Sequence, residues 1–167
     1  GSTVVLNPNR NFDGSSIWDI CEREGVNSLA IVGDAMAIPL IDALAENPDR
    51  WDLTAMFNIG SGGAVFSPAS QQAFRDHFPN VFISNSFGSS ESGNMGFDSG
   101  NKREAGGLGN VVKSDFMDVI TEEEGPDGPV HRHANPGEDG IFARSGYIPR
   151  GYYGDPEKTA RTFVPVD

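Results

Sequence analysis

The fold is indicated most clearly by residues 56–91, which read MFNIGSGGAVFSPASQQAFRDHFPNVFISNSFGSSE. Two short apolar runs, 56–59 and 81–83, have the length of strands and flank a segment with helical spacing. Ser67 and Pro68 supply an N-cap and a proline at the first position of that helix. A strand–helix–strand unit of this kind predicts two parallel strands joined by a right-handed crossover.

The residues before this unit extend the same pattern. Asp13 is placed to cap a helix that ends at Gly25, and residues 26–32 then predict a buried strand. The next helix has an apolar face formed by Met36, Leu40, Ile41 and Leu44. Strands that alternate with single helices predict the α/β class, with a parallel sheet and flanking helices, for residues 1–102.

The pattern changes after the third predicted strand. Residues 94–110 are rich in glycine, asparagine and charged residues and show no helical period. Beyond them, apolar runs such as 116–120 are separated by turn clusters such as 125–129, which predicts a small antiparallel β subdomain over residues 103–167. Near its end, Asp155 is placed to cap a short helix with proline at its first position.

Composition excludes several classes of protein. The net charge is −12 and no block of lysine and arginine occurs, so binding along a nucleic-acid backbone is not expected. Cys21 is the single cysteine, which rules out an intramolecular disulfide and predicts a reducing, cytoplasmic location. No stretch approaches the ~20 apolar residues of a membrane-spanning helix, so no transmembrane segment is expected.

Two polar segments rich in glycine and serine, 60–63 and 88–93, directly follow the second and third predicted strands. The carboxyl ends of parallel strands meet at one edge, where ligands of open α/β sheets bind. Glycine lets a ligand approach the backbone, and serine hydroxyls bond phosphate oxygens. Glu91 is the one charged residue of the second segment, and Mg²⁺ is usually held by one or two carboxylates plus phosphates. The pattern predicts a nucleotide–metal site, with a solvated loop around Glu91 as the alternative.

Two other functions fit parts of the pattern. Residues 88–92 nearly match the Gly-x-Ser-x-Gly nucleophile elbow of α/β-hydrolases, with His131 and His133 downstream. The match fails at Ser92, where the motif requires glycine, and residues 93–96 are a poor start for the helix that must follow the serine. A serine hydrolase of α/β type is therefore one alternative, and a non-catalytic α/β interaction module is another.

His131 and His133 also place two imidazoles on one face of a strand, as some metal sites do. The sequence nearby offers no third ligand, and the flanking prolines and glycines predict an exposed loop instead. Residues 122–124 are three glutamates beside a Pro-Gly turn, which predicts the solvated tip of a hairpin.

Three segments resemble motifs of the adenylate-forming enzymes, particularly the fatty acyl-CoA synthetases. Residues 85–93, NSFGSSESG, resemble the aromatic-Gly-x-Thr-Glu motif, and residues 61–68, SGGAVFSP, resemble the Gly-Gly-Ala-x-Leu-Ser segment that precedes it. Residues 151–160, GYYGDPEKTA, resemble the later Gly-Tyr-x-x-Asp-Pro-Glu-x-Thr segment. The three occur in the family's order and at similar spacing. The resemblance implies a fragment of the family's large N-terminal, AMP-binding domain, to which both predicted parts of the chain would belong.

The resemblance also implies roles for individual residues. Glu91 would bind Mg²⁺ and Ser90 would contact the α-phosphate of ATP, which makes these two the implied catalytic residues. The implied nucleotide-binding residues are Gly62, Gly63, Ala64, Asn85, Ser86, Phe87, Gly88 and Ser90. The residues implied to lie near the carboxylate substrate and its acyl tunnel are Gly93, Asn94, Met95 and Gly96. Serine at position 90 replaces the family's threonine and keeps the hydroxyl, and phenylalanine at 87 replaces tyrosine and keeps a face for adenine.

The activity implied by the resemblance is that of an ATP-dependent acyl-CoA synthetase, an acid–thiol ligase. Such an enzyme joins a fatty or other bulky hydrophobic carboxylic acid to ATP, releases pyrophosphate, and passes the acyl group from AMP to CoA. The implied cofactors and substrates are ATP, Mg²⁺, CoA and the acid. The family's phosphate loop and C-terminal domain, each with its lysine, are not found in the sequence. The chain alone is therefore expected to be inactive and to need the remaining parts of the same enzyme as partners.

Overall fold

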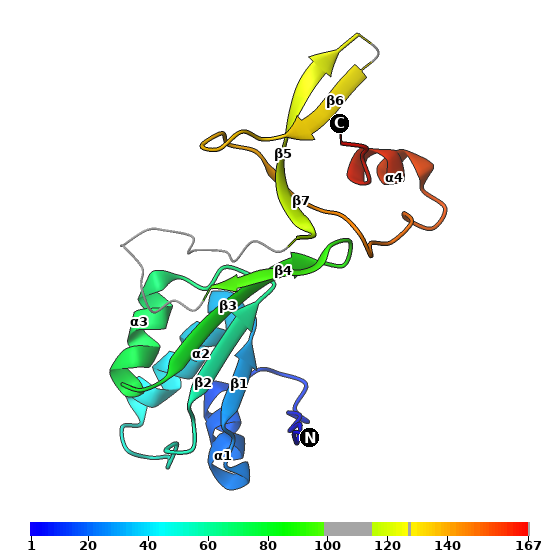
Figure 1. The fold of residues 1–167 in the computed structure, drawn as a ribbon. Coiled ribbons are helices and arrows are strands. Elements are labelled where there is room, and N and C mark those ends of the chain that lie inside the picture. Colours follow the sequence, from blue (N-terminus) through cyan, green and yellow to red (C-terminus); the bar gives the residue numbers. More distant parts are fainter. Residues whose placement is uncertain (99–114, 127, 167) are drawn as a thin grey trace. The chain divides into compact units, whose positions relative to one another are not determined.

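The computed structural model describes residues 1–98, 115–126 and 128–166, which Figure 1 shows as a ribbon. The chain divides into two compact units. The first unit holds residues 1–87 and 97–111, and the second holds residues 88–96 and 112–167. The predicted boundary between residues 102 and 103 lies outside the described residues.

The first unit begins with helix α1, Gly14–Glu24, whose two ends are fixed by local sequence. The Asp13 carboxylate accepts a hydrogen bond from the Ser16 backbone N–H at 2.8 Å, as an N-cap does. Gly25 ends the helix in the left-handed conformation, with φ of 60°, which glycine adopts without steric cost. Both predicted ends of this helix are confirmed.

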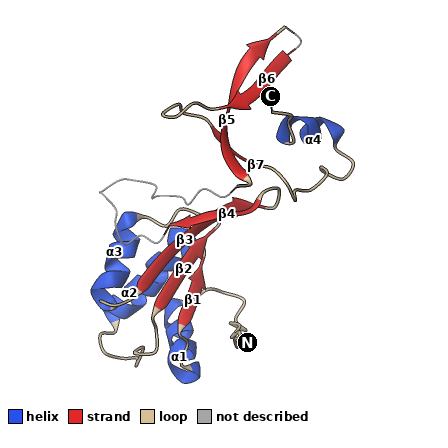
Figure 2. Cartoon of the chain, viewed as in Figure 1, coloured by secondary structure: helices blue, strands red, loops and turns tan. Residues whose placement is uncertain are grey.

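The sheet contains β1 (Ser28–Ile31), β2 (Asn58–Gly62) and β3 (Phe82–Ser89). β1 pairs with β2, and β2 with β3, both in parallel, so the predicted parallel sheet is confirmed (Figure 2). A fourth strand, β4 (Gly93–Asp98), extends the order to β1-β2-β3-β4. β4 was not predicted, because its glycine-rich residues lack the apolar alternation that marks a strand.

Helices α2 (Gly33–Glu46) and α3 (Pro68–His77) follow the first two strands, as predicted. α2 starts almost directly after β1. The first N–H groups of a helix have no partner within the helix, and here the Gly33 N–H donates to the Ser61 hydroxyl at 3.0 Å. The Ser67 hydroxyl caps α3, which has proline at its first position. The predicted start of α3 is confirmed.

The core of the first unit is formed by the helices and one face of the strands. Its largest fully buried apolar side chains are Trp18, Leu40, Ile59, Phe74 and Ile83. α2 packs against both α1 and α3, and the Trp18 indole donates to the Leu40 carbonyl at 2.9 Å. Along β1, Ile31 is buried whereas Ala30 is exposed. The strand was predicted to be buried, but the described residues cover just one of its two faces.

The second unit contains an antiparallel sheet of β5 (Met117–Gly125), β6 (Gly128–His133) and β7 (Ile141–Arg144). β5 lies between the other two strands, so the predicted antiparallel subdomain is confirmed. Met117 and Ile120 are the buried apolar side chains that the described strands β5 to β7 contribute. The second unit thus has far less apolar burial than the first.

Helix α4, Pro156–Thr162, is the last element of the chain. The Asp155 carboxylate caps it by accepting from the Lys158 N–H at 2.9 Å, so the predicted start of this helix is confirmed. Within the described ranges, no helix is long and apolar enough to cross a membrane.

The two histidines lie on β6 and not in an exposed loop, so that prediction is wrong. His131 Nε2 lies 3.2 Å from Glu122 Oε2, and Arg132 Nε lies 2.6 Å from Glu123 Oε1. Glu122 and His131 lie directly opposite each other on β5 and β6, whereas Arg132 lies opposite Thr121 and reaches Glu123 diagonally. Residues 122–124 are exposed at the end of β5 and lead into the last pair of the hairpin, Gly125 and Gly128, so the predicted solvated hairpin tip is confirmed. Glu122 and Glu123 also pair with basic side chains of β6, and such cross-strand pairs stabilise the hairpin.

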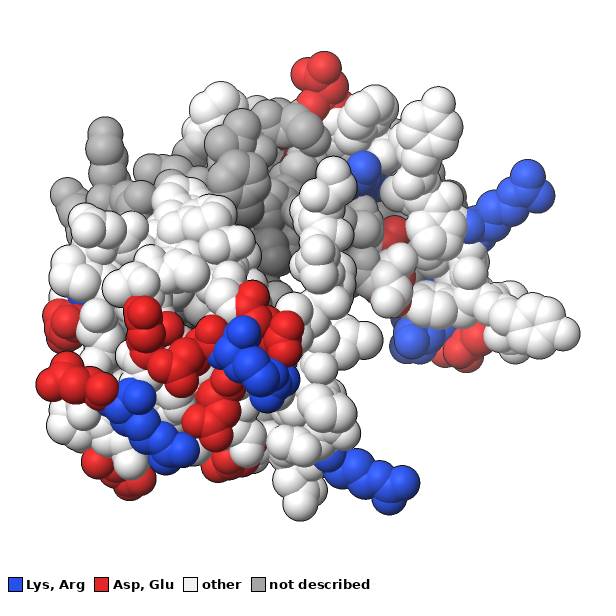
Figure 3. Space-filling view, turned by 90° about the horizontal axis from the view of Figure 1, so that it is seen from below, with Lys and Arg blue, Asp and Glu red and all other residues white. Residues whose placement is uncertain are grey.

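Charged side chains of both signs are mixed on the face that Figure 3 shows, and acidic groups predominate over its lower part. This agrees with a composition of 24 acidic against 12 basic residues. A surface of this kind repels a polyanion, whereas a small phosphate ligand can still be held by backbone N–H groups.

Candidate functional site

The first polar segment was predicted as a loop, but it belongs mostly to β2. Ser61 is buried, and its carbonyl accepts from the Ser86 hydroxyl on β3 at 3.2 Å. A Cβ at Gly62 would lie 2.6 Å from that hydroxyl, so glycine is required for this close approach of the two strands. The turn starts at Gly63, with φ of 82°, and the exposed Ala64 follows it.

Four of the predicted nucleotide-binding residues lie on β3: Asn85, Ser86, Phe87 and Gly88. The third strand was predicted over residues 81–83 with a loop at 88–93, but β3 continues to Ser89, because polar residues continue a strand wherever their backbone groups are paired. Ser86 lies directly opposite Gly62 in the register of β2 and β3. The structure thus brings two of the predicted nucleotide-binding residues together. Phe87 is partly buried.

The division between the two units falls within β3, between Phe87 and Gly88. The predicted adenine-binding residues up to Phe87 belong to the first unit. Ser90, Glu91 and the predicted substrate residues 93–96 belong to the second unit.

A turn at residues 90–92 leads from β3 to β4 and carries both predicted catalytic residues. The Ser89 hydroxyl accepts from the Glu91 N–H at 3.2 Å and from the Ser92 N–H at 3.1 Å. Ser90 is exposed, and its hydroxyl has no hydrogen-bond partner among the described residues. The roles of Ser89 and Ser92 were not predicted. The sequence could have indicated these roles through the several serines around Glu91, since serine hydroxyls bond nearby backbone groups in turns.

The strand that follows this turn is incompatible with a nucleophile elbow. The elbow needs a helix directly after the serine, but β4 begins at Gly93. Gly93 has φ of 66°, outside the right-handed helical region. The alternative of a serine hydrolase therefore lacks the backbone geometry that its motif requires.

Glu91 accepts a hydrogen bond at Oε1 from the hydroxyl of Tyr152. This bond is the largest cause of a lowered pKa at Glu91, to which the positive charge of Lys158 adds. The same bond raises the pKa of Tyr152, so at neutral pH an anionic carboxylate accepts from a neutral phenol. Tyr152 was not predicted as a site residue, although it lies in the Gly-Tyr pair of the third segment that resembles the family.

The residues predicted to lie near the acid substrate are on β4: Gly93, Asn94, Met95 and Gly96. Met95 is buried and lines a cavity of about 820 Å³ within the second unit, together with Glu91, Met117 and Arg144. The Arg144 guanidinium donates to the Asn94 carbonyl at 2.7 Å and so fixes the backbone of β4. The structure therefore places the predicted metal ligand and one predicted substrate residue on the same cavity.

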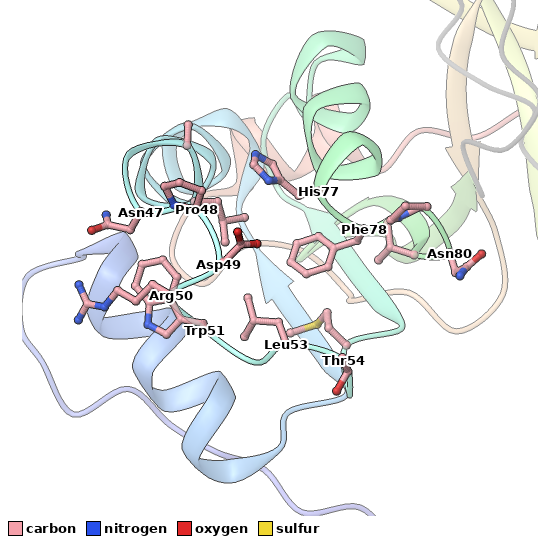
Figure 4. A pocket seen from close by; sticks show the side chains of 15 residues that line it. Asn47, Pro48, Asp49, Arg50, Trp51, Leu53, Thr54, His77, Phe78 and Asn80 are labelled. Atoms are coloured by element: carbon pink, nitrogen blue, oxygen red, sulfur yellow. The ribbon is translucent and has the colours of Figure 1, made fainter.

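Another cavity, of about 570 Å³, lies in the first unit and contains no predicted site residue (Figure 4). Its lining includes Trp51 and Leu53, which precede β2, and His77 and Phe78, which precede β3. It therefore lies at the amino ends of these strands. Since ligands of open α/β sheets bind beyond the carboxyl ends, the polar segments remain the candidate site.

Comparison with known proteins identifies the family. The model of the AMP-binding enzymes matches residues 1–153, nearly the whole chain. The chain belongs to the AMP-binding enzyme family. This membership confirms the resemblance to the adenylate-forming enzymes.

The AMP-binding chain has close relatives among CoA ligases. It is 38% identical over 167 residues to the 3-oxocholest-4-en-26-oate–CoA ligase of Rhodococcus rhodochrous, a match that covers 98% of this chain and 29% of the ligase. It is also 38% identical over 169 residues to a medium/long-chain-fatty-acid–CoA/3-oxocholest-4-en-26-oate–CoA ligase of Mycobacterium tuberculosis, covering 100% of this chain and 29% of that protein. The chain thus spans less than a third of the length of these curated relatives.

A solved structure shares the fold of the AMP-binding chain. The crystal structure of the anthranilate CoA ligase AuaEII in complex with anthranoyl-AMP superposes with a TM-score of 0.72, covering 98% of this chain and 30% of that one. The sequence identity is 19%, so the likeness shows the fold alone. It confirms the predicted α/β class.

The AMP-binding chain presents a carboxylate that suits a magnesium ion bound to phosphates. Tyr152 donates to Glu91 Oε1, and the hydrogen bonds to this carboxylate lower its pKa and so keep it anionic. Among the residues that the structure describes, no group of three or more His, Cys, Asp or Glu side chains could hold a metal alone. Mg²⁺ commonly takes one or two carboxylates and completes its shell with phosphate oxygens and water. Glu91 therefore fits an ion that arrives with the nucleotide.

Proposed function

We propose that the intact enzyme containing this chain is an AMP-forming acyl-CoA synthetase for hydrophobic carboxylic acids. The observation that carries the proposal is the turn at residues 90–92, in a chain of the AMP-binding family. There the Glu91 carboxylate accepts a hydrogen bond from Tyr152, and the hydroxyl of the preceding residue, Ser90, has no partner among the described residues. Relatives that are 38% identical act on medium- or long-chain fatty acids or on 3-oxocholest-4-en-26-oate.

In the proposed reaction a carboxylate oxygen of the acid attacks the α-phosphorus of ATP. The bond from that phosphorus to the bridging oxygen breaks, and pyrophosphate leaves with the electron pair. The sulfur of CoA then attacks the acyl carbonyl, AMP leaves, and the thiol proton passes to solvent. The first step brings two anions together, so its barrier falls when charge on the phosphate oxygens is offset. A magnesium ion bound with the nucleotide supplies positive charge for this purpose.

Within the chain, Glu91 is proposed to bind that Mg²⁺, and Ser90 to donate a hydrogen bond to the α-phosphate. The lowered pKa of Glu91 and the unpaired hydroxyl of Ser90 support these roles. The adenine site is proposed to comprise Gly62, Gly63, Ala64, Asn85, Ser86, Phe87 and Gly88. The pairing of Ser86 with Gly62 supports a shared site on these two strands.

A hydrophobic acid is favoured by apolar side chains at the carboxyl ends of the strands. Val32, directly after β1, is 49% exposed, and Val65, in the turn after β2, is 79% exposed. Ligands of open α/β sheets bind at this edge, and covering exposed apolar side chains there would stabilise a bound alkyl or polycyclic acid. Residues 93–96 are proposed to lie near its carboxylate.

The other parts of the reaction are proposed to come from outside these 167 residues. The family's phosphate loop and C-terminal lysine would be supplied by the rest of the enzyme, so the isolated chain is proposed to be inactive. Residues 1–102 and 103–167 are proposed to form one AMP-binding domain, since a single family match extends across both. A reducing, cytoplasmic location is proposed from the single cysteine, Cys21, which is buried.

The test is pyrophosphate release by the full-length enzyme with ATP, Mg²⁺, CoA and a panel of fatty, polycyclic and aromatic acids. We expect release that depends on the acid and is fastest with a fatty or polycyclic acid. Release with no acid of the panel, together with labelling of Ser90 by a fluorophosphonate, would instead support the hydrolase. Acid-dependent exchange of pyrophosphate into ATP by the isolated chain would show that the chain needs no further part.

A further inference from the structure

The hydrogen bond on the Glu91 side chain comes from a residue 61 positions later in the chain, Tyr152. The Tyr152 hydroxyl donates to Oε1, and this bond is the largest cause of the lowered pKa of Glu91. The turn that carries Glu91 is fixed locally by the Ser89 hydroxyl, which bonds backbone N–H groups and another serine. Within the turn, the Glu91 N–H and the Ser89 hydroxyl also act on the carboxylate, but the hydrogen bond from Tyr152 is the strongest of these interactions and the one that comes from outside the turn.

The backbone of Tyr152 is held in turn by the Gly-Tyr-x-x-Asp-Pro-Glu-x-Thr segment. The Tyr152 N–H donates to the Thr159 hydroxyl at 2.9 Å, and that hydroxyl donates to the Asp155 carbonyl at 2.7 Å. Gly151 has φ of 145° and no room for a side chain, because a Cβ there would overlap Thr159. The glycine, aspartate and threonine of the segment thus all act on the position of one residue, Tyr152.

The ring of Tyr152 is also held from two sides. The Lys158 ammonium lies 4.1 Å from the ring centroid, as in a cation–π contact. The Phe163 ring lies 5.9 Å away at an interplanar angle of 63°, close to an edge-to-face arrangement. Both contacts involve the ring and not the hydroxyl, which donates to Glu91 and is also hydrogen-bonded by the side chain of Thr162.

We propose that Tyr152 is a positioning residue for Glu91, which it orients toward the magnesium ion of the bound nucleotide. The proposal rests on the proposed function, because it needs Glu91 as a metal ligand. By donating to Oε1 as a neutral group, Tyr152 leaves the carboxylate its full negative charge for the cation. A carboxylate held in this way loses less side-chain freedom when the metal binds, so the metal binds more tightly.

The test measures binding without turnover. Calorimetry on the full-length enzyme gives the affinity for an ATP analogue with a non-hydrolysable link between the α- and β-phosphates, once with Mg²⁺ and once with a chelator. We expect Tyr152→Phe to reduce the gain in affinity from Mg²⁺ by about tenfold, the scale of one hydrogen bond to a charged group. Affinity in the chelator should be unchanged. The matched control is Tyr153→Phe, since Tyr153 is fully exposed and its gain should stay at the wild-type value.

The proposal would be overturned if Mg²⁺ raised the affinity of Tyr152→Phe for the analogue as much as it raises that of the wild type. It would also be overturned if the variant lost affinity equally with and without Mg²⁺, because that result indicates a structural role only. A wild-type gain in Glu91→Gln would show that Glu91 is not the metal ligand and would contradict the proposed role of Glu91 itself. If Tyr152→Phe does not fold, Thr159→Val replaces it, because it removes the hydroxyl that holds Tyr152. Thr159→Val should then show a smaller increase in affinity on adding Mg²⁺ than the wild type, whereas Thr159→Ser should show the wild-type increase. A wild-type increase in Thr159→Val with a smaller one in Thr159→Ser would overturn the proposal.

Discussion

Different kinds of interaction stabilise the interior of each of the two units. The first unit packs helices on a sheet through large apolar side chains such as Trp18 and Phe74, both with 0% exposure. The second unit buries fewer apolar side chains, and polar pairs such as Arg132–Glu123 and Tyr152–Glu91 connect its elements. Full burial of a large apolar side chain contributes about 1.5–3 kcal/mol, whereas an exposed ion pair contributes roughly 0–1 kcal/mol.

This difference separates stability from the orientation of catalytic groups. We infer that the free energy of unfolding depends mainly on the first unit. The groups proposed to act on phosphate and metal lie in the second unit, where hydrogen bonds orient them. Substitutions in the first unit should therefore change stability, and polar substitutions in the second should change ligand binding or rate while the protein stays folded.

The largest effect is expected from Phe74→Ala in α3. Removing a fully buried ring leaves a cavity, so the full-length enzyme should lose about 3–5 kcal/mol of unfolding free energy, measured by denaturant titration. The matched control is Phe82→Ala on β3, because that ring is 40% exposed and should cost much less. Equal losses at the two positions would mean that the core of the first unit does not carry the stability.

The next effect is expected from Glu91→Gln. The variant keeps the shape but removes the charge proposed to bind Mg²⁺, so pyrophosphate release should fall by about two orders of magnitude, the scale of a lost electrostatic contact in the transition state. The melting temperature should change little, because Glu91 is only partly buried and the amide oxygen of the glutamine can still accept from Tyr152. Glu124→Gln, an exposed glutamate of β5, should keep full activity. Ser90→Thr should also keep most activity, since the hydroxyl remains.

A smaller effect is expected from Phe87→Ala on β3. If the ring lies against adenine, the KM for ATP should rise by the equivalent of about 1–3 kcal/mol, as for the loss of a stacked base. Steady-state kinetics over a range of ATP concentrations provides the measurement. An unchanged KM with a lowered melting temperature would show that Phe87 packs within the fold and does not contact the nucleotide.

The smallest effect is expected from Arg132→Met on β6. Hydrogen bonds from Arg132 lower the pKa of Glu138 to about 2, from an ordinary value of 4.5. Because Glu138 has a lower pKa in the folded state than its ordinary value, its ionised form stabilises the fold at pH values above about 4.5. This contribution is lost as the pH falls from about 4.5 towards about 2. The variant should therefore melt slightly below the wild type at neutral pH, and the difference should narrow over that interval. A difference that widens in acid would contradict the sign of this effect.

Local sequence was sufficient to predict the helices of this fold. Asp13, Gly25, Ser67 and Asp155 mark helix ends through contacts that span only a few residues, and all four positions are confirmed. β4 and the extension of β3 could not be predicted in the same way. Their residues are polar or glycine, and they form strands because neighbouring strands satisfy their backbone groups.

The site shows the same limit. The turn with Ser90 and Glu91 could be located from sequence, because a carboxylate among glycines and serines is visible in a short segment. The contact of Glu91 with Tyr152 could not, since it depends on the two parts of the second unit meeting. The same holds for Arg144, which bonds the Asn94 carbonyl from 50 positions away.

The distance along the chain between Glu91 and Tyr152 also has a consequence during synthesis. A ribosome that adds ~5–20 residues per second needs roughly 3–12 s to pass from one residue to the other. The apolar core cluster of the first unit is already complete at Ile83, so it can form while the partner of Glu91 has not yet been made. A nascent chain that stops between the two residues would pack this core and still lack an oriented carboxylate.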